Sequence, residues 1–173
     1  GNVWIINTFA IVFCTLIVSY IAKRLIDKLM DKAHETHNLW DDALVGAAYQ
    51  PARYFIWLIG LSLAAQIASA NSSNELLLLV EPIRKIGIVI IIAWFLVRTA
   101  KRVEHNLADP EFSEKPMDET TVRAIGKLLR VSIIITATLV ALQSLGYSIS
   151  GVLAFGGVGG LAVGFAAKDM LAN

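Results

Sequence analysis

Leu161, Phe165 and Lys168 near the C-terminus have a spacing that suits an ion pathway. In a helix with about 3.6 residues per turn, these three side chains fall on one narrow face. If several copies surrounded a common axis, two rings of large apolar side chains would be followed by a ring of ammonium groups. Apolar rings can exclude water and ions, and a cationic ring attracts anions. The spacing therefore predicts a pore with its constriction at Leu161 and Phe165 and a charged mouth at Lys168.

Other kinds of chemistry have little support in the sequence. His34 and His37, with Glu35 and Asp41 nearby, could be drawn as a metal site, but the spacing of HETH differs from HExxH. Cys14 is the single cysteine and lies in an apolar run, which indicates a packing or lipid-facing residue. No Ser/His/Asp grouping, CxxC or GxGxxG is present. We therefore expect no enzyme, no metal, no cofactor and no nucleic-acid partner.

The helix that must position this face, 147–173, is rich in glycine and alanine. Each helical glycine costs roughly 1 kcal/mol relative to alanine, and close approach of a neighbouring helix is the usual compensation in membranes. The two flanks of the predicted face differ, so they fit head to tail, and such contacts can close into a ring. A simple dimer, or a helix packed in the interior, is the alternative. The residues expected between helices are Gly156, Gly157, Gly160, Ala162, Gly164, Ala166 and Ala167.

Composition predicts an all-α membrane protein. The chain has 173 residues, of which 56% are hydrophobic and 17% charged, and long apolar runs recur along it. Pro51 suits the first turn of a helix, and residues 106–121, with two prolines and many charges, suit a solvated loop. We expect five transmembrane helices: a four-span region over 1–146, with spans at about 3–22, 52–70, 76–97 and 122–145, and a pore-lining helix over 147–173.

Basic residues predict the orientation. They cluster in the segments that follow the first and third spans, whereas the opposite side carries few, so the positive-inside rule places the N-terminus outside and the C-terminus in the cytoplasm. Two groups could contact anionic lipid headgroups. These groups are Arg84 with Lys85, and Arg123 with Lys127 and Arg130. For the first group the alternative is simple interfacial anchoring. For the second the alternatives are contact with the soluble part of a neighbouring subunit or simply a charged face at the cytoplasmic surface.

The segment FGGVGGLAVGFAAKDMLAN resembles the pore-lining helix of small-conductance mechanosensitive (MscS-type) channels, and most of all that of the longer members with five spans. The likeness is specific over about 150–173. It implies a heptameric ring, a hydrophobic gate at Leu161 and Phe165, and a soluble domain after Asn173. Asp169 stands where founding members have a glycine at a kink, which puts the place of the kink in question.

The resemblance and the apolar face together favour a mechanosensitive channel that membrane tension opens during hypo-osmotic stress. The four-span region would sense tension through its lipid contacts, and ions and small osmolytes would permeate. A bacterial inner membrane is the expected location, with an organellar inner membrane as the second choice. The alternative function is an oligomeric membrane scaffold or regulatory subunit that does not conduct.

Overall fold

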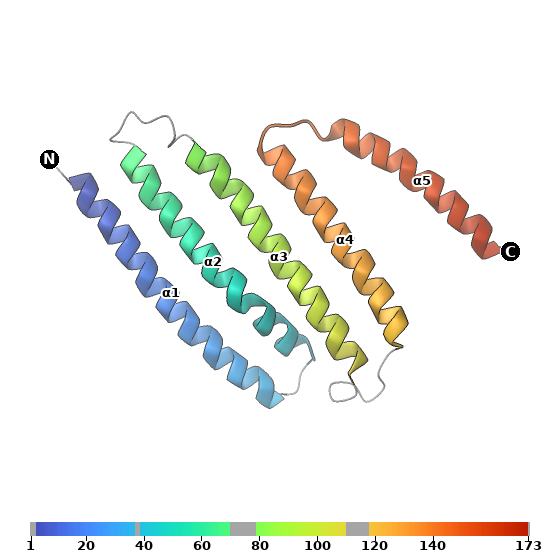
Figure 1. Cartoon of the computed structure of the whole chain (residues 1–173), viewed down its shortest axis with the longest axis horizontal. Coiled ribbons are helices and arrows are strands. Elements are labelled where there is room, and N and C mark those ends of the chain that lie inside the picture. The colour runs from blue at the N-terminus through green and yellow to red at the C-terminus, as the bar shows by residue number, and fades with distance from the viewer. Residues whose placement is uncertain (1–2, 37–38, 70–78, 110–117, 173) are drawn as a thin grey trace.

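The computed structural model describes residues 3–36, 39–69, 79–109 and 118–172, and it contains helices but no strand in these ranges. Figure 1 shows the helices in chain order. They are α1 (Val3–Thr36), α2 (Leu39–Ser69), α3 (Val80–Ala108), α4 (Glu119–Ser144) and α5 (Ser150–Ala172). The all-helical prediction is confirmed for the described residues.

The first four helices form a single layer of antiparallel neighbours. Each packs against the next in the sequence, α1 on α2, α2 on α3 and α3 on α4. Within the described ranges α5 packs against none of the others, and it diverges from the end of α4 (Figure 1). The architecture is therefore a four-helix layer with a separate fifth helix attached at one edge.

Four helices are long and apolar enough to cross a membrane, namely those that contain Val3–Ala33, Trp40–Ser69, Glu119–Ser144 and Ser150–Lys168. The third helix, α3, does not reach this standard. Its uncharged stretch, 86–97, lies between Lys85 and Arg98 and spans about 18 Å at 1.5 Å per residue, less than the roughly 30 Å of a bilayer core. Four of the five predicted spans are thus supported, and the third remains a prediction.

The boundary predicted at Pro51 is wrong. Helix α2 begins at Leu39, and Pro51 lies inside it. Proline in a helix removes one backbone hydrogen bond, at a cost of about 3 kcal/mol, but membrane helices tolerate it where neighbouring helices support the backbone. Here α2 is held on both sides by α1 and α3, and Ala43 and Ala47 in its early turns are fully buried.

The loop predicted over 106–121 is also shorter than expected. Helix α3 continues to Ala108, because the Asn106 side chain is buried against α2 and its amide donates to Asp42, 3.5 Å away. Helix α4 begins at Glu119, where the Asp118 carboxylate caps the helix by accepting from the Thr121 N–H at 2.9 Å. Residues 110–117 of the predicted loop lie outside the described residues.

Small residues let neighbouring helices approach closely. A side chain at Gly60 on α2 would overlap Thr15 on α1, and one at Gly87 on α3 would lie 2.7 Å from a methyl group of Leu58 on α2. The buried hydrophobic residues of the described part are correspondingly small. They are Ala33, Ala43, Ala47, Ala64, Ala100 and Val122.

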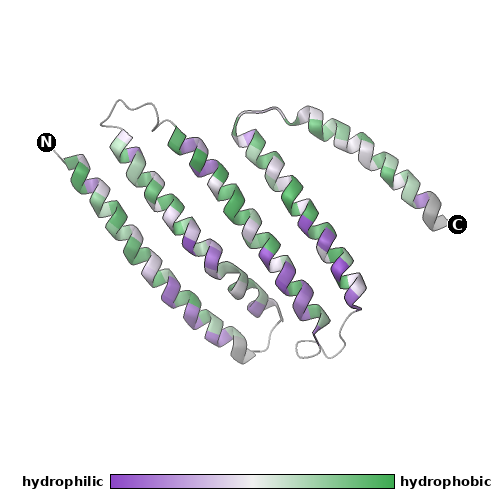
Figure 2. Cartoon of the chain, viewed as in Figure 1, coloured by the Kyte–Doolittle hydropathy of each residue, from purple (hydrophilic) through white to green (hydrophobic). Residues whose placement is uncertain are grey.

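The two ends of the packed helices differ in hydropathy. In Figure 2 the hydrophilic residues concentrate where α1 and α3 end and α2 and α4 begin, while the opposite part is mainly hydrophobic. Many large apolar side chains on the layer remain exposed, for example Phe9 at 72% and Ile90 at 59%. A one-helix-thick layer cannot cover both of its faces by itself, so these side chains require an apolar surrounding.

Candidate functional site

A tight turn at Gly146 separates the candidate pore helix from α4. The Gly146 N–H donates to the Gln143 carbonyl at 2.9 Å, and the Tyr147 N–H donates to the Leu142 carbonyl at 3.1 Å. This pair of bonds is a Schellman motif, which ends a helix with one left-handed residue. Gly146 supplies that residue with a φ of 88°. The turn stops α4 and allows α5 to begin only a few residues later.

The predicted pore residues share an uninterrupted helix. Leu161 and Phe165 are 65% and 66% exposed, and Lys168 is exposed as well. Helical spacing places the three on one face of α5. The backbone stays helical through Asp169, but the side chain of Asp169 lies outside what the structure describes.

The glycines of α5 face open space within this chain. A Cβ atom added at any of them would meet no other atom within 4 Å. The described side chains of α5, through Lys168, are all exposed. Among the described residues, therefore, no contact inside the chain offsets the helix-destabilising effect of these glycines. The glycines concerned are Gly151, Gly156, Gly157, Gly159, Gly160 and Gly164.

Most of the basic residues proposed for headgroup contact have partners in the chain. Arg84 on α3 donates to the side-chain carbonyl of Gln66 on α2 at 3.2 Å, and Lys85 forms an ion pair with Glu81 at 2.8 Å. On α4, Arg123 pairs with Glu119 one turn earlier, and both side chains are exposed. Such exposed pairs stabilise little and leave the cations able to exchange partners.

Arg130 differs from the other basic residues of α4. It pairs with Glu104 on α3, and the two side chains are only 21% and 19% exposed. The Glu104 carboxylate lies over the backbone of α4 at Gly126, where a side chain would overlap it. Arg130 therefore belongs to the contact between α3 and α4, a role that its spacing with Arg123 and Lys127 did not indicate.

A second set of polar contacts joins α2 to α3. Arg98 donates to the side-chain carbonyl of Gln50 and also lies over the ring of Trp94, 6.0 Å from its centroid. One turn further along α3, Arg102 fills the space beside Gly46. The isolated glycine Gly46 within a helical pattern could have indicated the contact with Arg102, because such a glycine often marks close packing.

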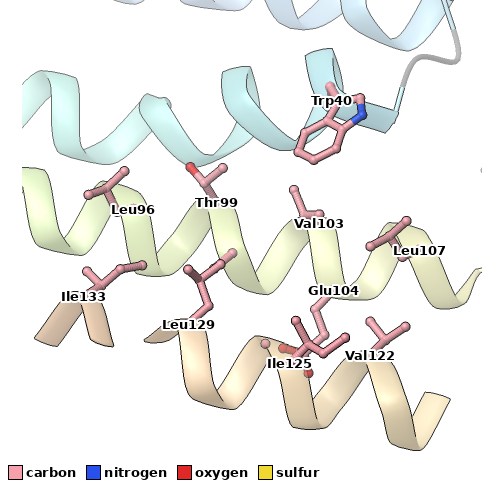
Figure 3. Close-up of a pocket in the computed structure, with 12 residues that line it drawn as sticks. Trp40, Leu96, Thr99, Val103, Glu104, Leu107, Val122, Ile125, Leu129 and Ile133 are labelled. Atoms are coloured by element: carbon pink, nitrogen blue, oxygen red, sulfur yellow. The ribbon is translucent and has the colours of Figure 1, made fainter. Parts of the chain in front are cut away.

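An apolar cavity of about 460 Å³ lies between α3 and α4, with Trp40 of α2 at its edge. Figure 3 shows Thr99 and Val103 of α3 and Ile125 and Leu129 of α4 around it. Glu104 is its charged lining residue, and its carboxylate is already paired with Arg130. The described side chains form no cluster of three metal-ligating groups, and the side chains of His34, Glu35 and His37 lie outside the described set.

Comparison with known proteins identifies the family. The family described as "Mechanosensitive ion channel, transmembrane helices 2/3" matches residues 127–168, from the middle of α4 almost to the end of α5. The low conductance mechanosensitive channel YnaI of Escherichia coli (strain K12) is 30% identical over 132 residues, 74% of this chain and 37% of the relative. The chain belongs to the MscS-type mechanosensitive channel family.

Other relatives of this MscS-type chain come from distant organisms. The mechanosensitive ion channel protein 1, mitochondrial, of Arabidopsis thaliana is 27% identical over 78% of this chain and 26% of the relative. The large-conductance mechanosensitive channel MscMJLR of Methanocaldococcus jannaschii is 28% identical over 98% of this chain and 47% of the relative. The chain thus spans about a quarter to a half of the length of these relatives. No solved structure gave a significant match.

The family match and the helices agree on the membrane character of the protein. The matched segment contains two of the four helices that are long and apolar enough to cross a membrane. The MscS-type chain is therefore a multi-pass membrane protein of a channel family, and its family recognition from residues 150–173 is confirmed.

Proposed function

We propose that this protein is an ion channel opened by membrane tension, with a ring of α5 helices around its pore. The observation that carries the proposal is the isolation of α5. It is an apolar helix whose described side chains are all exposed and whose glycines face open space. In a channel-family chain, such a helix is best explained by packing against copies of itself.

The ring forms through the two unlike flanks of α5. Gly160 and Gly164 line one flank, and Ala162 and Ala166 line the other, so an alanine ridge fits a glycine groove on the next subunit. Subunit number comes from the family resemblance, which implies a heptamer. Because only small residues meet at these contacts, the helices can slide and tilt without separating interlocked large side chains.

The gate in this proposal is the pair of apolar rings made by Leu161 and Phe165. In the closed state these rings are narrow enough to lose their water, which blocks ions without any plug. Lys168, one turn beyond Phe165, adds a cationic ring that raises the local concentration of anions. Ions and small osmolytes would pass when the ring widens during hypo-osmotic stress.

Tension acts on the layer formed by α1 to α4. This layer is one helix thick and exposes large apolar side chains, so lipids must cover it and changes in lipid packing act on it directly. Lipid headgroups at the two ends of these helices would contact four basic residues. These are Arg84 and Lys85 near the start of α3, and Arg123 and the exposed Lys127 near the start of α4. We place the protein in a bacterial inner membrane, N-terminus outside and C-terminus in the cytoplasm, with a soluble domain after Asn173.

Patch-clamp recording of the complete protein in pure lipid vesicles under stepped suction tests this function. Tension-activated unitary currents are expected, and Phe165→Ser should lower the threshold because a hydroxyl in the constriction favours wetting. Val163→Ser is the matched control, since Val163 is similarly exposed at 69% but lies on the opposite face of α5. Its threshold should match that of the wild type.

If protein shown to be folded and oligomeric gives no current up to membrane rupture, the channel function is refuted. A non-conducting scaffold or regulatory subunit would then be the better description. Equal effects of Phe165→Ser and Val163→Ser would keep the channel but remove the gate from Phe165.

A further inference from the structure

Within one chain, the connection from the four-helix layer to α5 is serial. Each of α1 to α4 packs on its neighbour in sequence, and among the described residues α5 packs on none of them. The covalent link after Leu145 joins α5 to α4, and within the described residues α4 packs on α3 alone. A displacement of α1, α2 or α3 therefore reaches α5 of the same chain through the contact between α3 and α4.

Apolar hollows run along the contact between α3 and α4. The cavity of about 460 Å³ lies along it at one end, and a second cavity of about 340 Å³ continues toward the other end, with Leu96 and Ile133 lining both. Both are lined mainly by apolar side chains, and apolar contact is non-directional, so it does not by itself fix the register of the two helices.

The ion pair between Glu104 and Arg130 supplies a fixed point in this interface. Figure 3 shows the Glu104 side chain extending from α3 toward α4 beside Ile125. Its carboxylate lies over Gly126 and accepts from Arg130 one turn further along α4. Both side chains are about four-fifths covered, so water screens the pair far less than it screens the exposed Arg123–Glu119 pair.

We propose that Glu104 and Arg130 are positioning residues that hold α3 to α4, so that tension on the layer is transmitted to α5. Gly126 is part of this device because the absence of a side chain there lets the carboxylate approach the backbone of α4. The gating part of the inference rests on the proposed function, whereas the mechanical coupling of α3 to α4 does not.

Three variants of the complete protein remove the coupling in different ways. Glu104→Gln and Arg130→Gln each delete one charge, and Gly126→Ala keeps both charges but displaces the carboxylate, since the added Cβ would lie 2.9 Å from the Glu104 carboxyl carbon. Each should raise the threshold tension, because α3 then slips against α4. The double variant Glu104→Gln/Arg130→Gln should raise it by less than the product of the two single effects, since both single variants break one interaction.

Glu119→Gln is the matched control. It removes the same charge as Glu104→Gln, but its partner Arg123 is on α4 itself, so the threshold should stay at the wild-type value. Thresholds unchanged in all three coupling variants, or changed equally by Glu119→Gln, would overturn the inference while leaving the channel in place.

A distance measurement decides the coupling independently of conduction. With Cys14 replaced by serine and labelled subunits diluted among unlabelled ones, spin labels at two exposed positions, Lys101 on α3 and Leu128 on α4, report the separation of the helices in vesicles. The wild-type background should give one narrow distance distribution, and each coupling variant should broaden it. If no wild-type current is found, the proposed function fails, and an unbroadened distribution then overturns the coupling as well.

Discussion

The side chain of Thr15 on α1 occupies the space that a side chain at Gly60 on α2 would need. The Thr15 hydroxyl donates to the Ile11 carbonyl of its own helix at 2.8 Å, so the threonine is satisfied without any partner on α2. Thr15 is also buried, although α1 exposes most of its other side chains. Steric fit between Thr15 and Gly60, and not a hydrogen bond between them, therefore sets the closest approach of α1 and α2, as is typical of helix contacts in membranes.

Gly60→Val should destabilise the α1–α2 pair by about 1–3 kcal/mol, the usual effect of overpacking a close contact. Unfolding of the purified protein in detergent measures the change. Thr15→Ala in the same chain should restore only part of the stability, because the Thr15 Cβ would itself lie 2.7 Å from the new Cβ. Leu61→Ala, at the neighbouring half-exposed position, is the control and should have a smaller effect. Equal stability of Gly60→Val and the wild type would contradict the contact.

Gly146→Ala should destabilise the protein by about 1–2 kcal/mol, because the left-handed conformation is costly for residues that carry a Cβ. Space is not the cause, since nothing lies within 4 Å of a Cβ at this position. Gly146→Asn should lose less stability than Gly146→Ala, because asparagine tolerates this conformation better than alanine. The ranking glycine, asparagine, alanine in thermal stability is the measurement, and a reversed order of the two variants would argue against the observed turn.

Replacing Gly160 and Gly164 by valine should abolish ring assembly, because branched side chains would fill the groove that the neighbouring α5 occupies in the proposed pore. Size-exclusion chromatography with light scattering reports the oligomeric state. Val152→Phe is the control, since Val152 is also exposed but lies on the face of α5 directly opposite Leu161. An intact oligomer in the Gly160/Gly164 variant would exclude the glycine flank from the interface.

Lys168→Gln should shift the permeability ratio of anions to cations toward unity at low ionic strength. At 1 M salt the Debye length is about 3 Å, so the difference between variant and wild type should disappear. Reversal potentials in salt gradients measure the ratio. Lys127→Gln removes an exposed cation from α4, outside the proposed pore, and should leave the ratio unchanged. A ratio insensitive to Lys168 would remove this residue from the permeation path.

Helix existence was predictable because apolar composition and length are local properties. In the described residues all five predicted apolar runs appear as helices, and the described turn at Gly146 is where a glycine follows the last apolar residues of α4. Helix ends were less predictable. Residues 106–108 were predicted as loop, and Pro51 as a helix start, yet both places lie inside helices that pack against a neighbouring helix.

The amino-acid sequence by itself determined the helical membrane class, the family and the face of α5 that bears Leu161, Phe165 and Lys168, because periodicity and composition act over a few turns of chain. Only the tertiary structure decided which basic side chains form ion pairs with another helix. Arg123 and Arg130 are two turns apart on one helix, yet the first pairs within α4 and the second with Glu104 across the interface. The physical reason is distance along the chain: Glu104 precedes Arg130 by 26 residues, and folding alone brings the two charges together.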